Sequence, residues 1–152
     1  MFSRSAGYSI QALTYLAGQP LGKLTGAREI ANASGIPMPF LWKVLRNLSQ
    51  RRLLRSFKGV HGGYELARPA GKISVGEILA ATPDNSLVAT CLLGLGQCDD
   101  ANPCPLHTSW QTLRTQIEKL AKSTTLADLA SELPKSARKR PSAGTRKRAR
   151  RT

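Results

Sequence analysis

Residues 27–66 read AREIANASGIPMPFLWKVLRNLSQRRLLRSFKGVHGGYEL, and this stretch carries the most informative pattern in the chain. A short helix is predicted over residues 27–33, and Gly35 ends it. After a tight connection, Pro39 can occupy the first position of the next helix, where its missing N–H is not needed. This helix runs to about Gln50, because apolar residues recur at positions i, i+3, i+4 and i+7. They are Leu41, Val44, Leu45 and Leu48.

Two short segments follow, residues 53–57 and 64–67, and the glycine-rich run between them favours a β-hairpin, because glycine adopts positive φ freely. A first helix over about residues 4–18 precedes the stretch, and Thr25 is placed to cap the short helix. Helix, short helix, tight turn, helix and hairpin in this order are typical of a winged helix-turn-helix. We therefore expect a mainly α fold with a small β-hairpin wing.

The second half of the chain adds further helices around an irregular loop. Ser74 and Glu77 have the spacing of a capping box, which predicts a helix to about Ala81. A long helix is predicted from Pro105, and Thr125 with Asp128 caps a last short helix that ends near position 133. The apolar positions of the long helix are Trp110, Leu113, Ile117 and Leu120.

The net charge of +14 is concentrated at the C-terminus. Residues 135–152 hold nine of the 23 basic residues and no acidic one, and they contain no large apolar side chain. Such a tail is expected to be disordered and to bind polyanions without reading sequence. No run approaches the ~20 apolar residues of a membrane span, and no leader is evident, so we expect a cytoplasmic protein that does not contact membranes. Its three cysteines then favour a site over disulfides.

Candidate DNA-contact residues follow from the winged-helix pattern. The helix after the turn enters the major groove, and the exposed residues of its first turns meet the base edges. Lys43 and Arg46 could reach phosphates or guanine, and Lys58 and His61 at the hairpin tip could reach the minor groove or backbone. Lys43 or Arg46 taken alone fits an ordinary solvent-exposed helix face equally well. The prediction therefore depends on the order of helices, turn and hairpin as a whole. The candidates are Arg28, Met38, Pro39, Phe40, Trp42, Lys43, Arg46, Lys58 and His61.

A second candidate site is formed by Cys91, Cys98, Cys104 and His107, which supply three thiolates and one imidazole. Their spacings are wider than the paired Cys-x2-Cys knuckles of structural zinc, and a long loop suits a bulkier iron–sulfur cluster. Zinc and a metal-free thiol role remain alternatives. We expect Cys104 to cap the long helix, with His107 one turn in. An enzyme with a Cys104/His107 nucleophile is disfavoured, because no third orienting residue is evident.

Several motifs resemble the Rrf-type winged-helix transcription regulators over about residues 1–125. They are REIANASGIP at 28–37, FL at 40–41, LRNL at 45–48, GVHGGY at 59–64, ISVGEI at 73–78 and the cysteine cluster. The resemblance implies a homodimer whose long helix forms the interface. It also implies an iron–sulfur cluster, commonly 2Fe–2S or 4Fe–4S, held by Cys91, Cys98 and Cys104. For this chain we expect 2Fe–2S in preference to 4Fe–4S. One branch of the family uses a histidine two residues beyond the third cysteine, which matches His107.

The chain also departs from the family pattern. Trp42 stands where one branch has an acidic residue that reads bases, and the hairpin carries Lys58, Val60 and His61 in place of an Arg-Gly-Pro-Gly sequence. Six residues separate the first two cysteines, where the family commonly has five. Another branch of the family uses an aspartate near the N-terminus of the partner subunit as the fourth cluster ligand. This chain cannot do so, because its first aspartate is Asp84. The operator sequence therefore cannot be transferred from a relative.

We therefore expect a sequence-specific, dimeric DNA-binding repressor that senses redox state, nitric oxide or iron–sulfur status. The alternative is a zinc-stabilised or thiol-based protein that binds double-stranded DNA without an iron–sulfur cluster. The expected organisation is a winged helix-turn-helix domain over 1–82, a cysteine loop over 83–104, a dimerisation helix with a short C-terminal helix over 105–134, and a disordered basic tail over 135–152.

Overall fold

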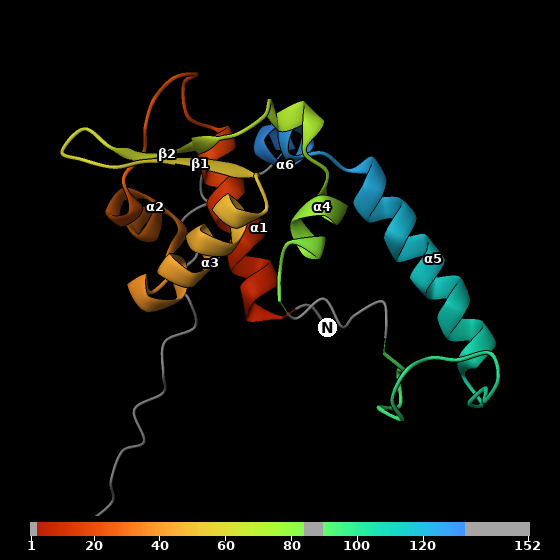
Figure 1. The fold of residues 1–152 in the computed structure, drawn as a ribbon. Coiled ribbons are helices and arrows are strands. Elements are labelled where there is room, and N and C mark those ends of the chain that lie inside the picture. The colour runs from red at the N-terminus through yellow and green to blue at the C-terminus, as the bar shows by residue number, and fades with distance from the viewer. Residues whose placement is uncertain (1–2, 84–89, 133–152) are drawn as a thin grey trace, which may run out of the picture.

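The computed structural model describes residues 3–83 and 90–132, so the expected basic tail lies outside the described residues. The fold is mainly α-helical with one two-stranded antiparallel hairpin, which confirms the expected fold class (Figure 1). In chain order the elements are α1 (Arg4–Ala17), α2 (Ala27–Ser34), α3 (Met38–Gln50), β1 (Leu54–Phe57), β2 (Gly63–Leu66), the 3-10 helix η1 (Ala70–Lys72), α4 (Val75–Ala80), α5 (His107–Ser123) and α6 (Leu126–Glu132).

The helix-turn-helix consists of α2, a tight turn and α3. Gly35 ends α2 in the left-handed conformation, with φ of 65°, which a residue with a side chain rarely adopts. Helix α3 begins at Met38, so Pro39 lies at the second helical position instead of the predicted first. Either position is compatible with proline, because the N–H groups of the first turn have no partner within the helix.

The hairpin packs against the segment that precedes α2. Leu54 pairs with Leu66 and Phe57 with Gly63 in the antiparallel register. Thr25 does not cap α2 as predicted: Gly26 is the N-cap residue, and Thr25 forms a β-bridge with Tyr64. A Cβ atom on Gly63 would lie 2.9 Å from the Thr25 carbonyl oxygen, so only glycine permits this close approach.

The hydrophobic core is organised around α1, which packs against α2, α3, α4 and α6. Leu13 of α1, Leu41 and Leu45 of α3 and Leu126 of α6 are all fully buried. Helix α6 follows the long helix in the sequence but packs into the winged-helix core. The Leu126 N–H donates to the Ile73 carbonyl at 2.8 Å, which ties α6 to the segment before α4.

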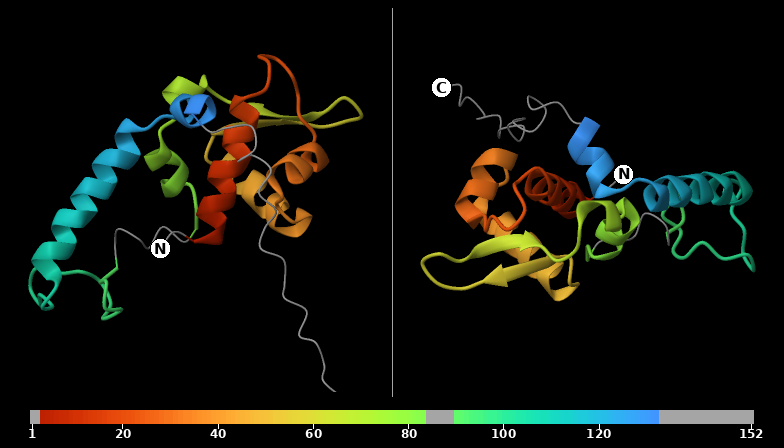
Figure 2. Two further views of the ribbon diagram at one scale, coloured as in Figure 1. Left: turned by 180° about the vertical axis from the view of Figure 1, so that it is seen from behind. Right: turned by 90° about the horizontal axis from the view of Figure 1, so that it is seen from above.

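Helix α5 projects away from this core as an arm, and the cysteine loop lies at its far end (Figures 1 and 2). The helix begins at His107 with Leu106 as its N-cap residue, two residues later than the predicted start at Pro105. The arm and the wing extend to opposite sides of the core in each view. In the described part of the chain, no helix is long and apolar enough to cross a membrane.

Candidate functional site

The exposed face of α3 carries most of the predicted DNA-contact residues. Trp42 is 51% exposed, and Lys43 and Arg46 are exposed beside it. Neither of these two cations forms an ion pair with another described residue. Their spacing of three along the helix places them on one surface, while the apolar positions between them face the core. This face can therefore present two free positive charges and one indole ring to a groove.

The other residues at the start of α3 are less available. Met38 is partly buried and packs against the hydrophobic core. Phe40 is half-exposed, and its ring contacts that of Tyr8 with centroids 6.0 Å apart and planes tilted by 58°. Pro39 is exposed between them. Of these predicted contact residues, Met38 therefore serves the fold most directly.

Arg28 lies exposed on α2, beside an anchored carboxylate. Glu29 accepts hydrogen bonds from Lys23 at 2.7 Å and from the Tyr15 hydroxyl at 3.0 Å. The Lys23 ammonium lowers the pKa of Glu29 below its usual value. Because Glu29 is occupied by these partners, the Arg28 guanidinium next to it stays available for a phosphate.

The wing presents its candidate residues at the hairpin tip. Lys58 and His61 are exposed there, and Gly59 between the strands has a φ of 103°. Across the strands, Arg55 forms an ion pair with Glu65 at 3.0 Å. Lys58 and His61 take no part in this ion pair, so both side chains at the tip are available to contact DNA.

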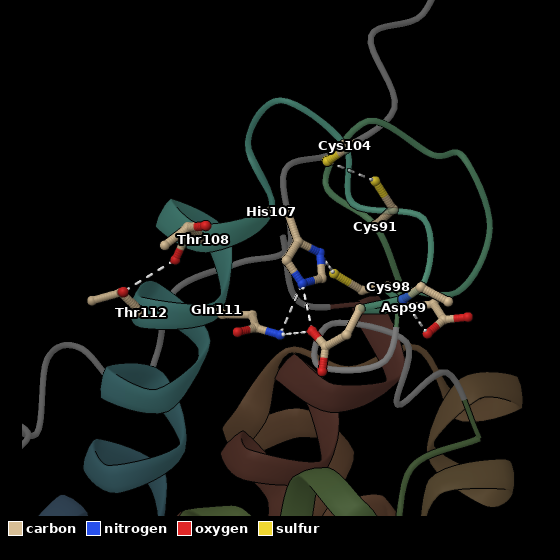
Figure 3. A network of polar contacts seen from close by, with 10 residues as sticks. Cys91, Cys98, Asp99, Cys104, His107, Thr108, Gln111 and Thr112 are labelled. Carbon is tan, nitrogen blue, oxygen red and sulfur yellow. Dashed lines mark hydrogen bonds and ion pairs between the residues drawn. The ribbon is translucent and has the colours of Figure 1, made fainter.

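The structure brings together all four predicted ligands at the start of α5 (Figure 3). The Sγ atoms of Cys91 and Cys104 are 3.7 Å apart, and the Cys98 Sγ atom lies 3.4 Å from Nδ1 of His107. The side chains thus form two close pairs. Within residues 3–83 and 90–132, no group of three or more potential ligands converges on one point as around a metal ion.

The cysteine loop turns sharply just after Cys91. The Cys91 N–H donates to the Gly96 carbonyl, and the Gly94 N–H donates to the Cys91 carbonyl, both at 2.9 Å. Gly94 and Gly96 have φ values of 72° and 102°, conformations that favour glycine. This turn directs backbone N–H groups toward the buried Cys91 sulfur. Hydrogen bonds from the Leu93 and Leu95 backbone lower the pKa of the Cys91 thiol, which favours the thiolate needed for metal binding.

The end of the loop differs from the sequence-based expectation. Cys104 does not cap α5 through its side chain. Instead its carbonyl accepts a hydrogen bond from the His107 N–H at 2.9 Å in a turn just before the helix. His107 is the first residue of α5 and is buried, while Cys98 and Cys104 are half-buried. Pro105 is the second residue of this turn, a position that suits proline because its φ is already fixed near the required value.

Three residues at this site were missed by sequence reasoning. The Asp100 carboxylate accepts hydrogen bonds from His107 Nε2 at 2.7 Å and from Gln111 Nε2 at 2.8 Å. Trp110, predicted as an apolar position of the helix, donates from its indole N–H to the Thr90 carbonyl at 3.2 Å. Of these three residues, only Gln111 could have been found from the sequence, because it lies four residues after His107 and so on the same face of the predicted helix.

The donor set fits an iron–sulfur or zinc centre in its chemistry. Thiolates and imidazole are the ligands that soft and borderline metals prefer, and the four side chains lie on one loop and one helix start. The Asp100 carboxylate behind His107 is a typical outer partner of a metal-binding histidine. Cys91, Cys98, Cys104 and His107 are therefore the residues that could hold such a group.

Comparison with known proteins gives a consistent result. The family model described as "Rrf2: Iron-dependent Transcriptional regulator" matches residues 2–132. A protein of Aquifex aeolicus, described as an HTH-type transcriptional regulator, is 38% identical over 131 residues, which is 85% of this chain and 90% of that protein. The HTH-type transcriptional regulator IscR of Vibrio vulnificus is 34% identical over 104 residues, covering 68% of this chain and 61% of IscR.

Among solved structures, that of CymR, the global cysteine regulator of B. subtilis, superposes with a TM-score of 0.74. The match covers 88% of this chain and 98% of CymR at 24% identity, so it bears on the fold alone. These relatives are transcription regulators and not enzymes, as predicted for this chain. The chain belongs to the Rrf2 family of transcription regulators.

Proposed function

We propose that this protein is a dimeric, sequence-specific DNA-binding repressor whose affinity depends on an iron–sulfur cluster held by Cys91, Cys98, Cys104 and His107. One observation carries the cluster part of the proposal. Ligand side chains that are spread over 17 residues of sequence meet in two pairs, with separations of 3.7 and 3.4 Å. Cysteines that served only packing would not be expected to pair with one another and with a histidine in a polar loop.

DNA recognition is assigned to α3 and the wing. Trp42, Lys43 and Arg46 would enter the major groove, and Arg46 can form the bidentate contact to guanine that arginine commonly makes. Lys58 and His61 would touch the backbone or minor groove beside it. Arg28 on α2 would bind a phosphate and so fix the register of the protein on the duplex.

Dimer formation is assigned to the exposed apolar side chains of α5. Leu113 and Leu120 of α5 and the N-cap residue Leu106 recur every seven residues, and all three are exposed, Leu120 to 67%. A seven-residue apolar repeat on a projecting helix is typical of a helix that packs against a second helix. A two-fold dimer through this stripe would present two copies of α3 to a two-fold operator.

The cysteine loop would influence α3 through α5 and the winged-helix core. The loop is anchored to α5 by the Trp110–Thr90 hydrogen bond, and at its other end α5 leads into α6, which packs in the winged-helix core. When bound, the cluster would supply a centre that responds to redox state, nitric oxide and iron supply. A change in loop conformation would tilt α5 and thereby alter the spacing of the two α3 helices. The basic tail, residues 135–152, would add affinity without sequence preference.

The test is anaerobic purification followed by an absorption spectrum, an iron and sulfide assay, and binding to the protein's own operator, selected from a random DNA pool. We expect a brown protein with stoichiometric iron and sulfide, and a change in operator affinity when the cluster is removed. Binding to a random duplex should change far less. A colourless anaerobic preparation that contains stoichiometric zinc would contradict the cluster.

The 3.7 Å separation of Cys91 and Cys104 also suits a second candidate function, a regulator that senses oxidants through these thiols without metal. In that case the purified protein would contain neither iron nor zinc, and its operator affinity would respond to oxidant and to thiol reductant. The metal assay therefore separates the two candidates before any DNA is added.

A further inference from the structure

The two ring nitrogens of His107 lie in different surroundings. Nδ1 is 3.4 Å from the Cys98 sulfur, and Nε2 is 2.7 Å from Oδ1 of Asp100. Gln111, one turn further along α5, lies beside His107 (Figure 3), and its amide nitrogen is 2.8 Å from the same Asp100 oxygen. His107 therefore has a sulfur on one side of its ring and an acceptor oxygen on the other.

The short contact with Asp100 decides where the ring carries its proton. An ionised carboxylate has only acceptor sites, so an Nε2 atom at 2.7 Å must carry a hydrogen. The Gln111 amide nitrogen also lies 3.0 Å from His107 Nε2. If it donated to a bare Nε2 atom, that nitrogen and the Asp100 oxygen would be two acceptors only 2.7 Å apart, which is unfavourable. A neutral ring then has its lone pair on Nδ1, the atom that faces the Cys98 sulfur.

We propose that Asp100 is a positioning residue that holds His107 in the Nε2-protonated tautomer, so that Nδ1 is the atom offered to a metal beside Cys98. Gln111 supports this role by fixing the carboxylate from the next turn of α5. The assignment of a metal rests on the proposed function, whereas the tautomer itself does not. Asp100 therefore determines which ring nitrogen of His107 has a free lone pair before any metal binds.

Exposure makes this role separable from folding. The His107 side chain is 10% exposed and is held by α5, whereas the Asp100 side chain is 85% exposed on the loop. A substitution at Asp100 therefore leaves the packed core intact. Asp99 is a matched neighbour, because it is also an exposed aspartate of this loop, and its carboxylate accepts from the Ala101 N–H instead of from the histidine.

The chain allows a direct test, because it contains only two histidines and the second, His61, lies exposed on the wing. The full-length, metal-free protein is labelled with 15N, and the ring nitrogens are assigned by long-range 1H–15N correlation at a pH where the rings are neutral. We expect His107 to be protonated at Nε2 in the wild type. In Asp100→Asn the ratio of this tautomer to the other should fall about two- to tenfold, the equivalent of one ordinary hydrogen bond. Asp99→Asn and the His61 signals should be unchanged.

A second measurement uses the anaerobically reconstituted protein. A carboxylate that accepts from a histidine ligand makes that ligand a stronger donor, so Asp100→Asn should raise the midpoint potential of the centre and weaken metal retention about tenfold or more. Asp99→Asn removes the same charge and should do neither. A wild-type ring protonated at Nδ1, or equal effects of the two variants, would overturn the positioning role. The iron and sulfide content of the wild type tests the proposed function separately. The spectra of the metal-free protein test the tautomer whether or not a cluster is found.

Discussion

At the scale of single residues, one face of α3 is buried in the core and the other, proposed to bind DNA, is exposed. Lys43 and Arg46 are exposed, whereas Leu45 between them is fully buried. Truncation of a leucine such as Leu45 would cost about 2–5 kcal/mol of stability, which would lower every activity together. Substitution of the exposed residues should instead alter DNA binding in a folded protein.

Arg46→Ala should weaken operator binding by about 1–3 kcal/mol and relax the preference at one base position, because a groove contact to a base edge is lost. Lys58→Ala should weaken binding to operator and random duplex alike and lower the slope of log affinity against log salt by about 1, because a phosphate contact is lost. Binding titrations over a range of salt concentrations measure both effects. Equal loss on both duplexes for Arg46→Ala would show that this residue contacts only the backbone.

His107→Ala should sharply reduce the iron that remains after anaerobic purification, because one ligand is removed from the set. His107→Cys should retain the cluster at a lower midpoint potential, because a thiolate adds negative charge where imidazole is neutral. His61→Ala is the matched control and should behave as the wild type in the iron and sulfide assay. Unchanged iron and potential in both His107 variants would assign the fourth ligand elsewhere.

At the scale of elements, short helices in this fold depend on their caps. Helix α4 has six residues and begins with a complete capping box, in which Ser74 accepts from the Glu77 N–H and Glu77 accepts from the Ser74 N–H. Helix α6 repeats the device with Thr125 and Asp128. Because helices this short are unstable alone, their caps and their packing hold them in place.

Ser74→Ala should destabilise the protein by about 1 kcal/mol, because the first turn of α4 loses its acceptor. The backbone hydrogen bond from Ser74, and after it Arg68, lower the pKa of Glu77 in the folded state. The stabilisation by this carboxylate is therefore complete above the unfolded pKa of about 4.3 and is lost as pH falls through the folded value. Urea unfolding of wild type and Glu77→Gln should thus differ near neutral pH and converge in acid. Ser109→Ala on exposed α5 is the control and should not destabilise.

At the scale of the whole molecule, the winged-helix core and the cysteine loop are held apart by α5 (Figure 2). Contacts of α5 with the core are mainly with α4, near the end of the arm that leads to α6. A single chain therefore leaves Leu113 and Leu120 of the arm exposed. These exposed apolar side chains are the observation that supports the proposed dimer contact.

Leu120→Asp should convert the protein to a monomer, because a charge would be placed in the proposed helix–helix contact. Sedimentation velocity measures the oligomeric state. Operator titration should show weaker binding, because a monomer can contact only one half of a two-fold operator. Leu21→Asp makes the same chemical change at a fully exposed loop position outside the arm and should leave the dimer intact. A dimer that survives Leu120→Asp together with Leu113→Asp would move the interface to another surface.

The local features of this protein follow from its sequence, because periodicity, capping and turn chemistry act over a few residues. The helices of the core and the glycine-bearing hairpin were predicted in this way, with boundaries that differ by one or two residues, and so was the Ser74–Glu77 box. The sequence also grouped Cys91, Cys98, Cys104 and His107, whose role as ligands stays a prediction. The contacts made between distant segments were not predicted. The Thr25–Tyr64 bridge and the packing of α6 into the core depend on how preformed elements dock, and no short-range pattern encodes that docking. The Asp100–His107 contact spans only seven residues, but it depends on the path of an irregular loop, which periodicity does not describe.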